Sequence, residues 1–279
     1  MKRIMTIQDI SCIGKCSLTV ALPIISAMGI ETAIVPTALL STHTAFSEFT
    51  FKDLTSEMRP IKDHWKKENF KFDAIYTGYL GSKEQIKIVG EYIDSFKGPN
   101  TIVIVDPAMA DNGKLYAGFD MDFVREMEKL CQRADFILPN ISEACLLMDE
   151  GYPGEEADEE TIHKLLIKLT AHDMRFPIIT GTAFADGTFG FTGVDSVNGE
   201  IFRYGTKKIP HKSHGTGDIF ASTFTGALMN DYSYLDALKI ASKYTCACIE
   251  NTYNDPERVN YAVNFEAEIP YLLKLINKY

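Results

Sequence analysis

The chain has 279 residues, of which 46% are hydrophobic and 24% charged, and its formal net charge is −10 at pH 7. This length fits one large α/β domain, and no run approaches the roughly eighteen uninterrupted apolar residues of a membrane-spanning helix. A negative charge without a basic block argues against nucleic acids and anionic membranes as partners. Residues 1–3 lead into a short β-rich run and not into a secretion signal, so we expect a cytoplasmic protein.

The six cysteines and six histidines form no metal-binding motif. Three residues separate Cys12 from Cys16 and one residue separates Cys246 from Cys248, so there is no Cys-x2-Cys pair. We therefore expect reduced, mostly buried thiols and no transition metal ligated by the protein.

Strand-like and helix-like segments alternate over the first 180 residues. Short apolar or β-branched runs predict strands over residues 2–7, 30–36, 72–77, 101–105, 135–138 and 176–180. Helical spacing predicts helices over residues 17–28 and 55–69 and a further helix that begins at Ser82. This alternation indicates an α/β fold with a mostly parallel sheet covered by helices on both faces, and we expect a single domain over residues 1–279.

Polar residues follow the predicted strands, at the sheet edge where open α/β sheets bind ligands. They are Asp9, Thr44, Tyr79, Asp106, Asn140, Glu143 and Thr180. Asp9 is placed to face a substrate, although a turn or helix-capping role explains it equally well. Asn140 and Glu143 likewise have the spacing of a helix N-cap and its capping-box partner. Gly14 and Lys15 do not form a P-loop, because the flanking positions that the motif requires are Asp9 and Cys16.

Between residues 183 and 212 the pattern changes to glycine-containing, β-like pieces. We expect two or three antiparallel strands there, forming a small edge or lid region of the sheet. After Asp218 the pattern is helical to the end of the chain, with the last long helices expected over residues 234–250 and 264–278.

Residues 215–228 predict a glycine turn followed by a buried helix, because apolar residues recur at every fourth position from 220 to 228. The first N–H groups of a helix have no intrahelical partner, and two glycines let an anion approach them, so the turn can hold a phosphoryl oxygen. The alternative is an ordinary capped helix, with Thr216 as the N-cap and Asp218 complementing the helix dipole.

Five motifs resemble those of the pyridoxal kinases of the ribokinase-like superfamily, and the resemblance covers essentially the whole chain. They are Ser41-Thr42-His43-Thr44, Thr77-Gly78-Tyr79-Leu80-Gly81-Ser82, Val105-Asp106-Pro107, Pro139-Asn140-x-x-Glu143 and Gly215-Thr216-Gly217-Asp218. The first two are typical of vitamin B6 kinases, and the others are shared across the superfamily. The resemblance implies a ribokinase-like fold and ATP-dependent phosphorylation of the 5′-hydroxymethyl group of pyridoxal, pyridoxamine or pyridoxine.

The resemblance also implies residue roles. Asp218 would be the catalytic base, its pKa held low by the helix N-terminus, and the anion hole would be Gly215, Thr216 and Gly217. The substrate-side candidates are Asp9, Ser41, His43, Thr44 and Tyr79. ATP contacts would come from Asp106, Asn140, Glu143, Thr180, Gly181, Gly215 and Gly217, with Asp106 and Glu143 binding Mg²⁺ through water. A homodimer is also expected, and a requirement for a monovalent cation such as K⁺ is left open.

The chain departs from the family pattern on the substrate side. It reads Gln8-Asp9-Ile10 where the family has Gln-Ser-His, Cys16-Ser17 where the family has Gly-Asn, and Ala110-Asp111 where the family has Gly-Asp. If Asp9 faces the substrate ring, its charge favours pyridoxamine, which carries an ammonium group. Two alternatives stay open: a hydroxymethylpyrimidine kinase of the same fold, and a B6-binding homologue without turnover, against which the intact Asp218 argues.

Overall fold

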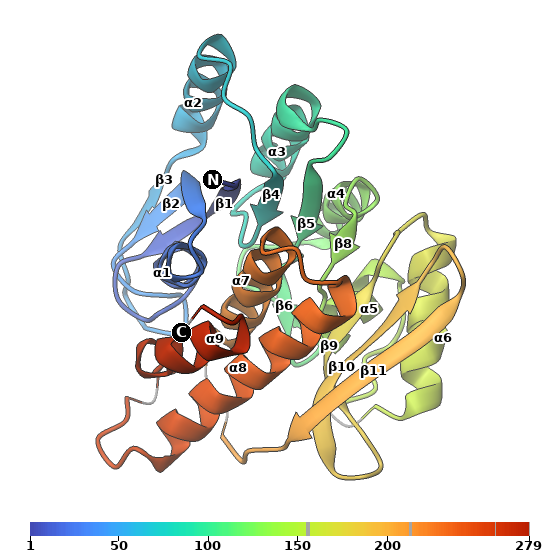
Figure 1. Ribbon diagram of the computed structural model, residues 1–279. Coiled ribbons are helices and arrows are strands. Elements are labelled where there is room, and N and C mark those ends of the chain that lie inside the picture. The colour runs from blue at the N-terminus through green and yellow to red at the C-terminus, as the bar shows by residue number, and fades with distance from the viewer. Residues whose placement is uncertain (155–156, 212–213, 260, 279) are drawn as a thin grey trace. The chain divides into compact units, whose positions relative to one another are not determined.

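The computed structural model describes residues 1–154, 157–211, 214–259 and 261–278. The chain forms two compact units, the first comprising Met1–Tyr76 and Ile209–Tyr279 and the second Thr77–Lys208 (Figure 1). Each unit contains both helices and strands, and the central sheet of this α/β fold is mostly parallel. The expected single domain stays a prediction.

Four neighbouring strands of the first unit lie in the order β3-β2-β1-β4. Their bounds are β1 Arg3–Ser11, β2 Glu31–Leu40, β3 Phe51–Asp53 and β4 Ala74–Thr77. β1 and β2 are parallel, whereas the short β3 pairs antiparallel with the end of β2. The register of β1 against β2 shifts between Gln8 and Ile10, so the irregularity falls at Asp9. Such bulges redirect side chains and occur often beside functional sites.

The described helices of the first unit are α1 Leu18–Ala27, α2 Thr55–Lys67, α7 Thr216–Met229, α8 Tyr234–Asn254 and α9 Ile269–Leu275, with a 3-10 turn, η1, at Glu266–Glu268. α1, α7, α8 and α9 form one group of packed helices, whereas α2 packs on β2. α7 contacts both α1 and α8, and Figure 1 shows α8, in orange, passing in front of it. Every residue from Ile219 to Ala227 is buried. A helix that is buried on all sides is covered by its neighbours, so α7 exposes mainly its N-terminal turn.

The second unit carries one parallel strand pair, one hairpin and one antiparallel sheet. The pair is β5 Ile102–Val105 with β8 Phe136–Ile137, and the hairpin is β6 Ala110–Asp111 with β7 Lys114–Leu115. The antiparallel sheet has the order β11-β10-β9, with bounds β9 Ile178–Ala183, β10 Thr188–Asp195 and β11 Glu200–Lys207. The helices are α3 Lys83–Phe96, α4 Met121–Cys131, α5 Ile141–Leu147 and α6 Glu159–Ala171.

Side-chain caps fix where the helices of the second unit begin. Ser82 accepts the N–H of Gln85 at the start of α3, while the Gln85 side chain accepts the N–H of Gly81 at 2.7 Å. Asp120 and Asp158 cap α4 and α6 in the same way. The start predicted at Ser82 is therefore confirmed, although Gln85 reaches one residue before the cap.

The structure differs from the sequence expectations in three segments. The strand expected over residues 176–180 appears as β9, which begins two residues later and pairs antiparallel with β10, while Pro177 and Thr180 make isolated parallel bridges to Ile137 and Asn140. The helix expected over residues 264–278 is shorter and consists of η1 and α9. The hairpin at residues 110–115 was not expected. The antiparallel strands expected between residues 183 and 212 are confirmed as β10 and β11, with Lys212 outside the described residues.

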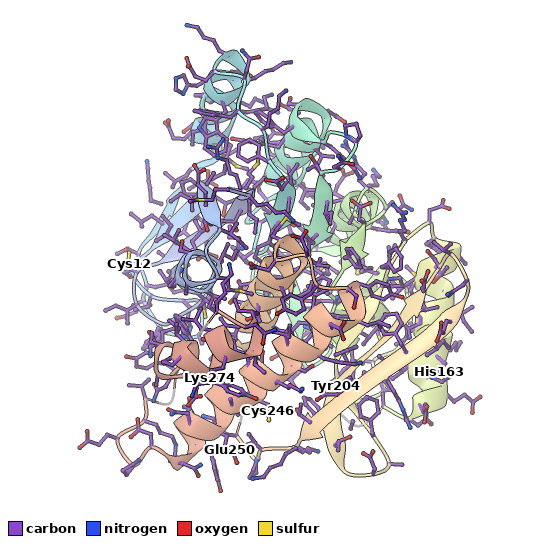
Figure 2. The ribbon with its side chains drawn as sticks, in the orientation of Figure 1. Cys12, His163, Tyr204, Cys246, Glu250 and Lys274 are labelled. Atoms are coloured by element: carbon purple, nitrogen blue, oxygen red, sulfur yellow. The ribbon has the colours of Figure 1, made fainter. Side chains whose placement is uncertain are left out.

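The cysteines are less buried than expected. Cys131, Cys145 and Cys248 are buried, Cys16 and Cys246 are half-buried, and Cys12 is exposed (Figure 2). Among the described helices, none combines the length and the apolar character needed to cross a bilayer.

Candidate active site

The predicted glycine turn forms the N-terminus of α7 in the first unit. Gly215 is the N-cap and has a left-handed backbone, with φ of 85°. A Cβ at this position would lie 2.3 Å from the carbonyl oxygen of Lys15, so a glycine is required there. The first intrahelical bond runs from the Ile219 N–H to the Gly215 carbonyl oxygen, at 3.0 Å. The N–H groups of residues 216–218 precede that bond and can bind an anion.

The N-cap is therefore Gly215 and not Thr216, which the capped-helix alternative required. Thr216 and Gly217 lie with Asp218 in the first turn of α7. This turn combines backbone donors for an anion with one carboxylate, as the glycine-turn interpretation predicts.

Asp218 is half-buried, and its carboxylate accepts the backbone N–H of Ser17. Burial raises the pKa of Asp218 to about 7, and the negative charge of Asp9 adds to the rise. The expectation of a low pKa was wrong, because desolvation and a neighbouring carboxylate outweigh the helix dipole. Asp218 consequently changes charge near neutral pH.

Asp9 is only 3% exposed and lies among hydroxyl groups. The Ser11 hydroxyl donates to its carboxylate at 2.9 Å, and the Ser17 side chain also bonds to it. Burial raises the pKa of Asp9, while these bonds oppose the rise. The described partners of the Asp9 carboxylate are thus Ser11 and Ser17. Contact between Asp9 and a substrate stays a prediction.

The loop between β1 and α1 supplies residues that the sequence analysis did not assign. Gly14, Lys15 and Ser17 all have positive φ, at 128°, 53° and 54°. The Cys16 thiol is close enough to Asp218 and Asp9 that both carboxylates, after burial, raise its pKa. The departure from the family pattern at residues 16 and 17 could have marked this loop as part of the site. The sequence did not show, however, that the loop lies against Asp218.

His43 is 6% exposed and is held on both ring nitrogens. Nδ1 accepts the N–H of Ala45 at 3.2 Å, so Nε2 carries the proton and donates to the carbonyl oxygen of Tyr261 at 2.9 Å. Burial lowers the pKa of His43, and His214, whose ring centroid is 4.9 Å away, contributes to the decrease. A direct hydrogen bond from neutral His43 to a substrate would break one of these bonds.

Ser41 and Thr44 flank His43 after β2. The Ser41 hydroxyl accepts the N–H of Thr50 at 2.9 Å, which fixes the start of the connection to β3. Thr44 is exposed. The structure thus brings Asp9, Asp218 and the glycine turn into one cluster and places His43 beside His214 at its edge.

Asn140 and Glu143 in the second unit form a capping box that also holds the hairpin. Asn140 Oδ1 accepts the Glu143 N–H at 2.9 Å, and Glu143 Oε2 accepts the Asn140 N–H at 2.8 Å. Glu143 Oε1 accepts the N–H groups of Met109 at 3.1 Å and Ala110 at 3.5 Å, and Asn140 Nδ2 donates to the Ala110 carbonyl at 2.8 Å. The helix-cap interpretation of this pair is confirmed.

Backbone N–H groups occupy most of the acceptor positions of the Glu143 carboxylate, and its contact with Mg²⁺ through water stays a prediction. A carboxylate offers roughly four acceptor positions, and the three backbone N–H groups occupy most of them. The side chain is 2% exposed, and burial raises its pKa to about 8 while the N–H groups oppose the rise. The described residues contain no group of three or more His, Cys, Asp or Glu side chains placed to hold a metal ion.

The remaining predicted residues of the second unit lie near strand ends. Asp106, half-buried, follows β5 and donates its N–H to the Thr77 carbonyl oxygen at 3.0 Å. Thr180 bridges to Asn140, so these two predicted nucleotide contacts lie side by side. Gly181 follows in β9 with φ of 76°.

Tyr79, predicted to contact the substrate ring, belongs to an aromatic cluster. Its ring stacks on Phe119 with centroids 5.7 Å apart, and Tyr116 lies 6.5 Å away. All three side chains are half-buried. Phe119 stacks in turn on Phe123 of α4 at 3.9 Å. Tyr116 and Phe119 follow the unexpected hairpin and were therefore missed.

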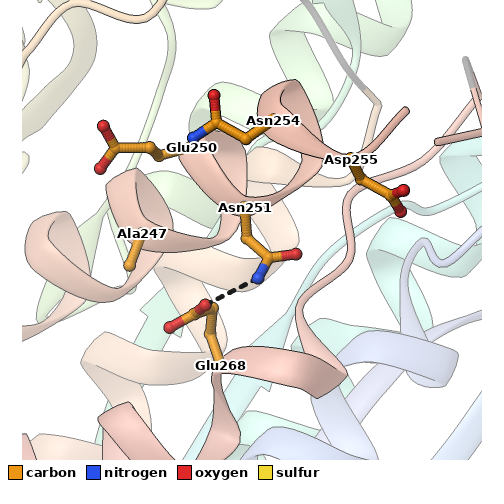
Figure 3. Close-up of a pocket in the computed structure, with 6 residues that line it drawn as sticks. All are labelled: Ala247, Glu250, Asn251, Asn254, Asp255 and Glu268. Carbon is orange, nitrogen blue, oxygen red and sulfur yellow. Dashed lines mark hydrogen bonds between the residues drawn. The ribbon is translucent and has the colours of Figure 1, made fainter. Parts of the chain in front are cut away.

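A surface depression of about 610 Å³ in the first unit contains none of the predicted residues. It is lined by Ala247, Glu250, Asn251, Asn254, Asp255 and Glu268 (Figure 3). Asn251 Nδ2 donates to Glu268 Oε1 at 2.9 Å across it. Three carboxylates repel a phosphate, so this depression is a poor site for a nucleotide.

Comparisons with known proteins identify the family and the fold of this chain. The family model of phosphomethylpyrimidine kinase matches residues 22–263. A Bacteroides thetaiotaomicron protein assigned to the phosphomethylpyrimidine kinases, whose crystal structure contains pyridoxal, is 37% identical, with a TM-score of 0.91 over 97% of this chain and 95% of that one. The pyridoxal kinase of Lactobacillus plantarum is 29% identical, with a TM-score of 0.89 over 99% and 98%. The pyridoxine/pyridoxal/pyridoxamine kinase of Bordetella avium is 25% identical over 86% of this chain and 82% of that protein.

Proposed function

The chain belongs to the phosphomethylpyrimidine kinase family, and we propose that it transfers the γ-phosphoryl group of MgATP to the 5′-hydroxymethyl group of a vitamin B6 vitamer. Pyridoxal in the structure of the 37% identical Bacteroides protein supports this substrate class. The motif at residues 41–44, which resembles the B6 kinases, supports it independently.

The observation that carries the proposal is the position of Asp218. Its carboxyl, whose pKa is raised to about 7, belongs to the first turn of α7, where the N–H groups that follow the left-handed Gly215 have no intrahelical acceptor. Kinase chemistry needs these two functions together, because one group must hold the transferring phosphoryl oxygens while another takes the proton of the alcohol.

In this mechanism Gly215, Thr216 and Gly217 bind the oxygens of the transferring phosphoryl group. In a loose transition state the alcohol keeps its proton until late, and Asp218 accepts it as the new P–O bond forms. A carboxylate with a pKa near 7 is a stronger proton acceptor than an ordinary one. Positioning and charge neutralisation supply most of the rate, and the Mg²⁺ that enters with ATP supplies positive charge.

The other assignments follow from the family resemblance. Asp106, Asn140, Glu143, Thr180 and Gly181 would serve ATP, with Asp106 and Glu143 contacting Mg²⁺ through water. Ser41, Thr44 and Tyr79 would hold the pyridine ring. His43 would support the loop that carries Ser41 and Thr44. A cytoplasmic location, a homodimer and a response to K⁺ belong to the same proposal, and ultracentrifugation and rates in K⁺ and Na⁺ buffers test the last two.

Hydroxymethylpyrimidine is the second candidate substrate, because the matching family model is that of the phosphomethylpyrimidine kinases. The test is an assay with ATP, Mg²⁺ and each of pyridoxal, pyridoxamine, pyridoxine and hydroxymethylpyrimidine, with products identified by mass spectrometry. We expect kcat/KM for at least one B6 vitamer to exceed that for hydroxymethylpyrimidine by about tenfold or more. The reverse order would transfer the assignment to the pyrimidine, and binding of a vitamer without turnover would identify a non-catalytic homologue.

A further inference from the structure

Ser17 joins the two carboxylates of the first unit. Its backbone N–H donates to the Asp218 carboxylate, and its side chain bonds to Asp9. It immediately precedes α1, whereas Asp218 begins α7 and Asp9 lies near the end of β1. One residue therefore connects the three elements that meet at the glycine turn.

The backbone of Ser17 is strained. Its φ of 54° and ψ of −128° are conformations that glycine adopts readily and a residue with a Cβ does not. Its side chain does not cap α1. Strain of this kind persists only where the surroundings enforce it. In this conformation the Ser17 N–H donates to the Asp218 carboxylate, and the Ser17 hydroxyl forms a hydrogen bond with Asp9.

Two contacts of Lys15 also hold the loop that precedes Ser17. The Lys15 carbonyl approaches Gly215 so closely that a Cβ there would lie 2.3 Å from it. The Lys15 ammonium forms an ion pair with Glu266 at 2.8 Å. The strained backbone is thus held between the glycine turn and the segment that leads to α9.

We infer that Ser17 and Asp9 are positioning residues for the catalytic base. The Ser17 N–H orients the Asp218 carboxylate, and Asp9 anchors the Ser17 hydroxyl so that Ser17 keeps its left-handed backbone. Asp9 also places a second negative charge beside the base. This inference rests on the proposed function, because it takes Asp218 as the proton acceptor.

The burial of Asp9 distinguishes this role from substrate recognition. At 3% exposure, with hydroxyl bonds from Ser11 and Ser17, its carboxylate is directed at this chain. The titratable groups that act on Asp218 and its surroundings are Asp9 from β1 and the Cys16 thiol from the loop. The negative charge of Asp9 adds to the rise in the pKa of Asp218, so the acidic limb of the pH–rate profile should respond to the charge at residue 9.

The kinetic test measures kcat and KM against pH for Asp9→Asn, Ser17→Ala, Ser17→Gly and the matched control Ser11→Ala. Asp9→Asn removes the neighbouring charge, so the acidic limb of kcat should move to lower pH by about one unit. Ser17→Ala should lower kcat by about tenfold with little change in KM, because the unanchored backbone relaxes and Asp218 is misplaced. Ser17→Gly should recover most of that loss, since glycine adopts the positive φ without an anchor.

Ser11→Ala removes the other hydroxyl from Asp9 without altering Ser17, so it should reduce kcat less than Ser17→Ala. Equal losses in the two variants would contradict the anchoring role. An unmoved acidic limb in Asp9→Asn, together with a change of about tenfold in the ratio of kcat/KM for pyridoxal to that for pyridoxamine, would show that Asp9 recognises the substrate and would overturn the inference.

A carboxyl titration gives a result that does not depend on turnover. In protein labelled with ¹³C at aspartate carboxyl groups, the resonance absent from Asp218→Asn identifies Asp218. Its midpoint should decrease in Asp9→Asn, and an unchanged midpoint in that folded variant would refute the coupling. If the wild type phosphorylates no B6 vitamer, the proposed function fails, while this titration still decides whether Asp9 acts on Asp218.

Discussion

Asp218 is subject to two opposing effects, and their relative size decides its chemistry. Its place in the first turn of α7 favours the carboxylate, whereas burial and the charge of Asp9 favour the protonated form. The second effect is larger, since the pKa rises to about 7. The sequence indicated the residue through its motif. It could not indicate the pKa, because Asp9 and Ser17 approach Asp218 only in the fold.

Replacing Asp218 with asparagine tests the assignment of the base. The amide keeps the shape of the side chain and can still accept the Ser17 N–H, but it cannot take a proton from the alcohol. We expect kcat to fall by about 10²–10⁴-fold with little change in the KM for ATP. Activity within about threefold of the wild type would remove Asp218 from this role.

The same substitution should stabilise the protein in a pH-dependent way. The pKa of Asp218 is about 7 in the folded state, against about 3.9 for an aspartate in an unfolded chain. Above pH 4 the unfolded chain ionises this carboxyl, whereas the folded protein keeps it protonated up to about pH 7, so stability falls as pH rises over this interval, and Asp218→Asn avoids the loss. Urea unfolding should show its stability advantage growing over that interval and constant above it. A pH-independent difference would contradict the raised pKa.

Among the elements, the N-terminal turn of α7 was predicted most completely. Its two glycines, its carboxylate and its apolar spacing are local, so the sequence carries them directly. The hairpin at residues 110–115 was missed because its short strands depend on contacts with α5, such as the bond from the Gly113 N–H to Ser142. The antiparallel pairing of β9 was missed because an apolar run does not specify the direction of its partner.

The glycine turn should fail when its first glycine gains a side chain. Gly215→Ala combines a φ of 85° with a Cβ 2.3 Å from the Lys15 carbonyl, so the turn must shift. Gly187→Ala is the matched control, because its φ of 81° is similar but no atom lies within 4 Å of its Cβ position. Both should lose about 1–2 kcal/mol from backbone strain. Only Gly215→Ala should also lose most of its kcat, and equal activities would argue against the anion hole.

The capping box of Asn140 and Glu143 at the start of α5 stabilises the fold and is also proposed to order water around Mg²⁺. Two measurements separate these roles. Asn140→Ala and Glu143→Ala should each destabilise the protein by about 1–3 kcal/mol, because buried backbone N–H or C=O groups lose their partners. If Glu143 also orders water around Mg²⁺, both variants should need more Mg²⁺ for half-maximal rate. Asp158→Ala, which removes the cap of α6, should lose stability alone. An unchanged Mg²⁺ requirement in all three variants would leave the box purely structural.

At the scale of the whole molecule, the alternation of strands and helices predicted the α/β class correctly, and the family match over residues 22–263 agrees with it. The predicted residues divide between the two units. The base, the glycine turn and Asp9 belong to the first unit. The proposed ATP contacts Asp106, Asn140, Glu143, Thr180 and Gly181 belong to the second. A chain of net charge −10 binds a polyphosphate most readily with a divalent cation, which is why MgATP is the proposed donor.

The central claim is tested most directly by a competition experiment. Equimolar pyridoxal and hydroxymethylpyrimidine are incubated with limiting ATP, Mg²⁺ and either the wild type or Asp218→Asn, and both phosphorylated products are quantified by mass spectrometry. We predict that the wild type forms mainly pyridoxal 5′-phosphate and that Asp218→Asn slows its formation by at least about a hundredfold. Predominant phosphorylation of the pyrimidine, or equal rates in the two proteins, would contradict the account.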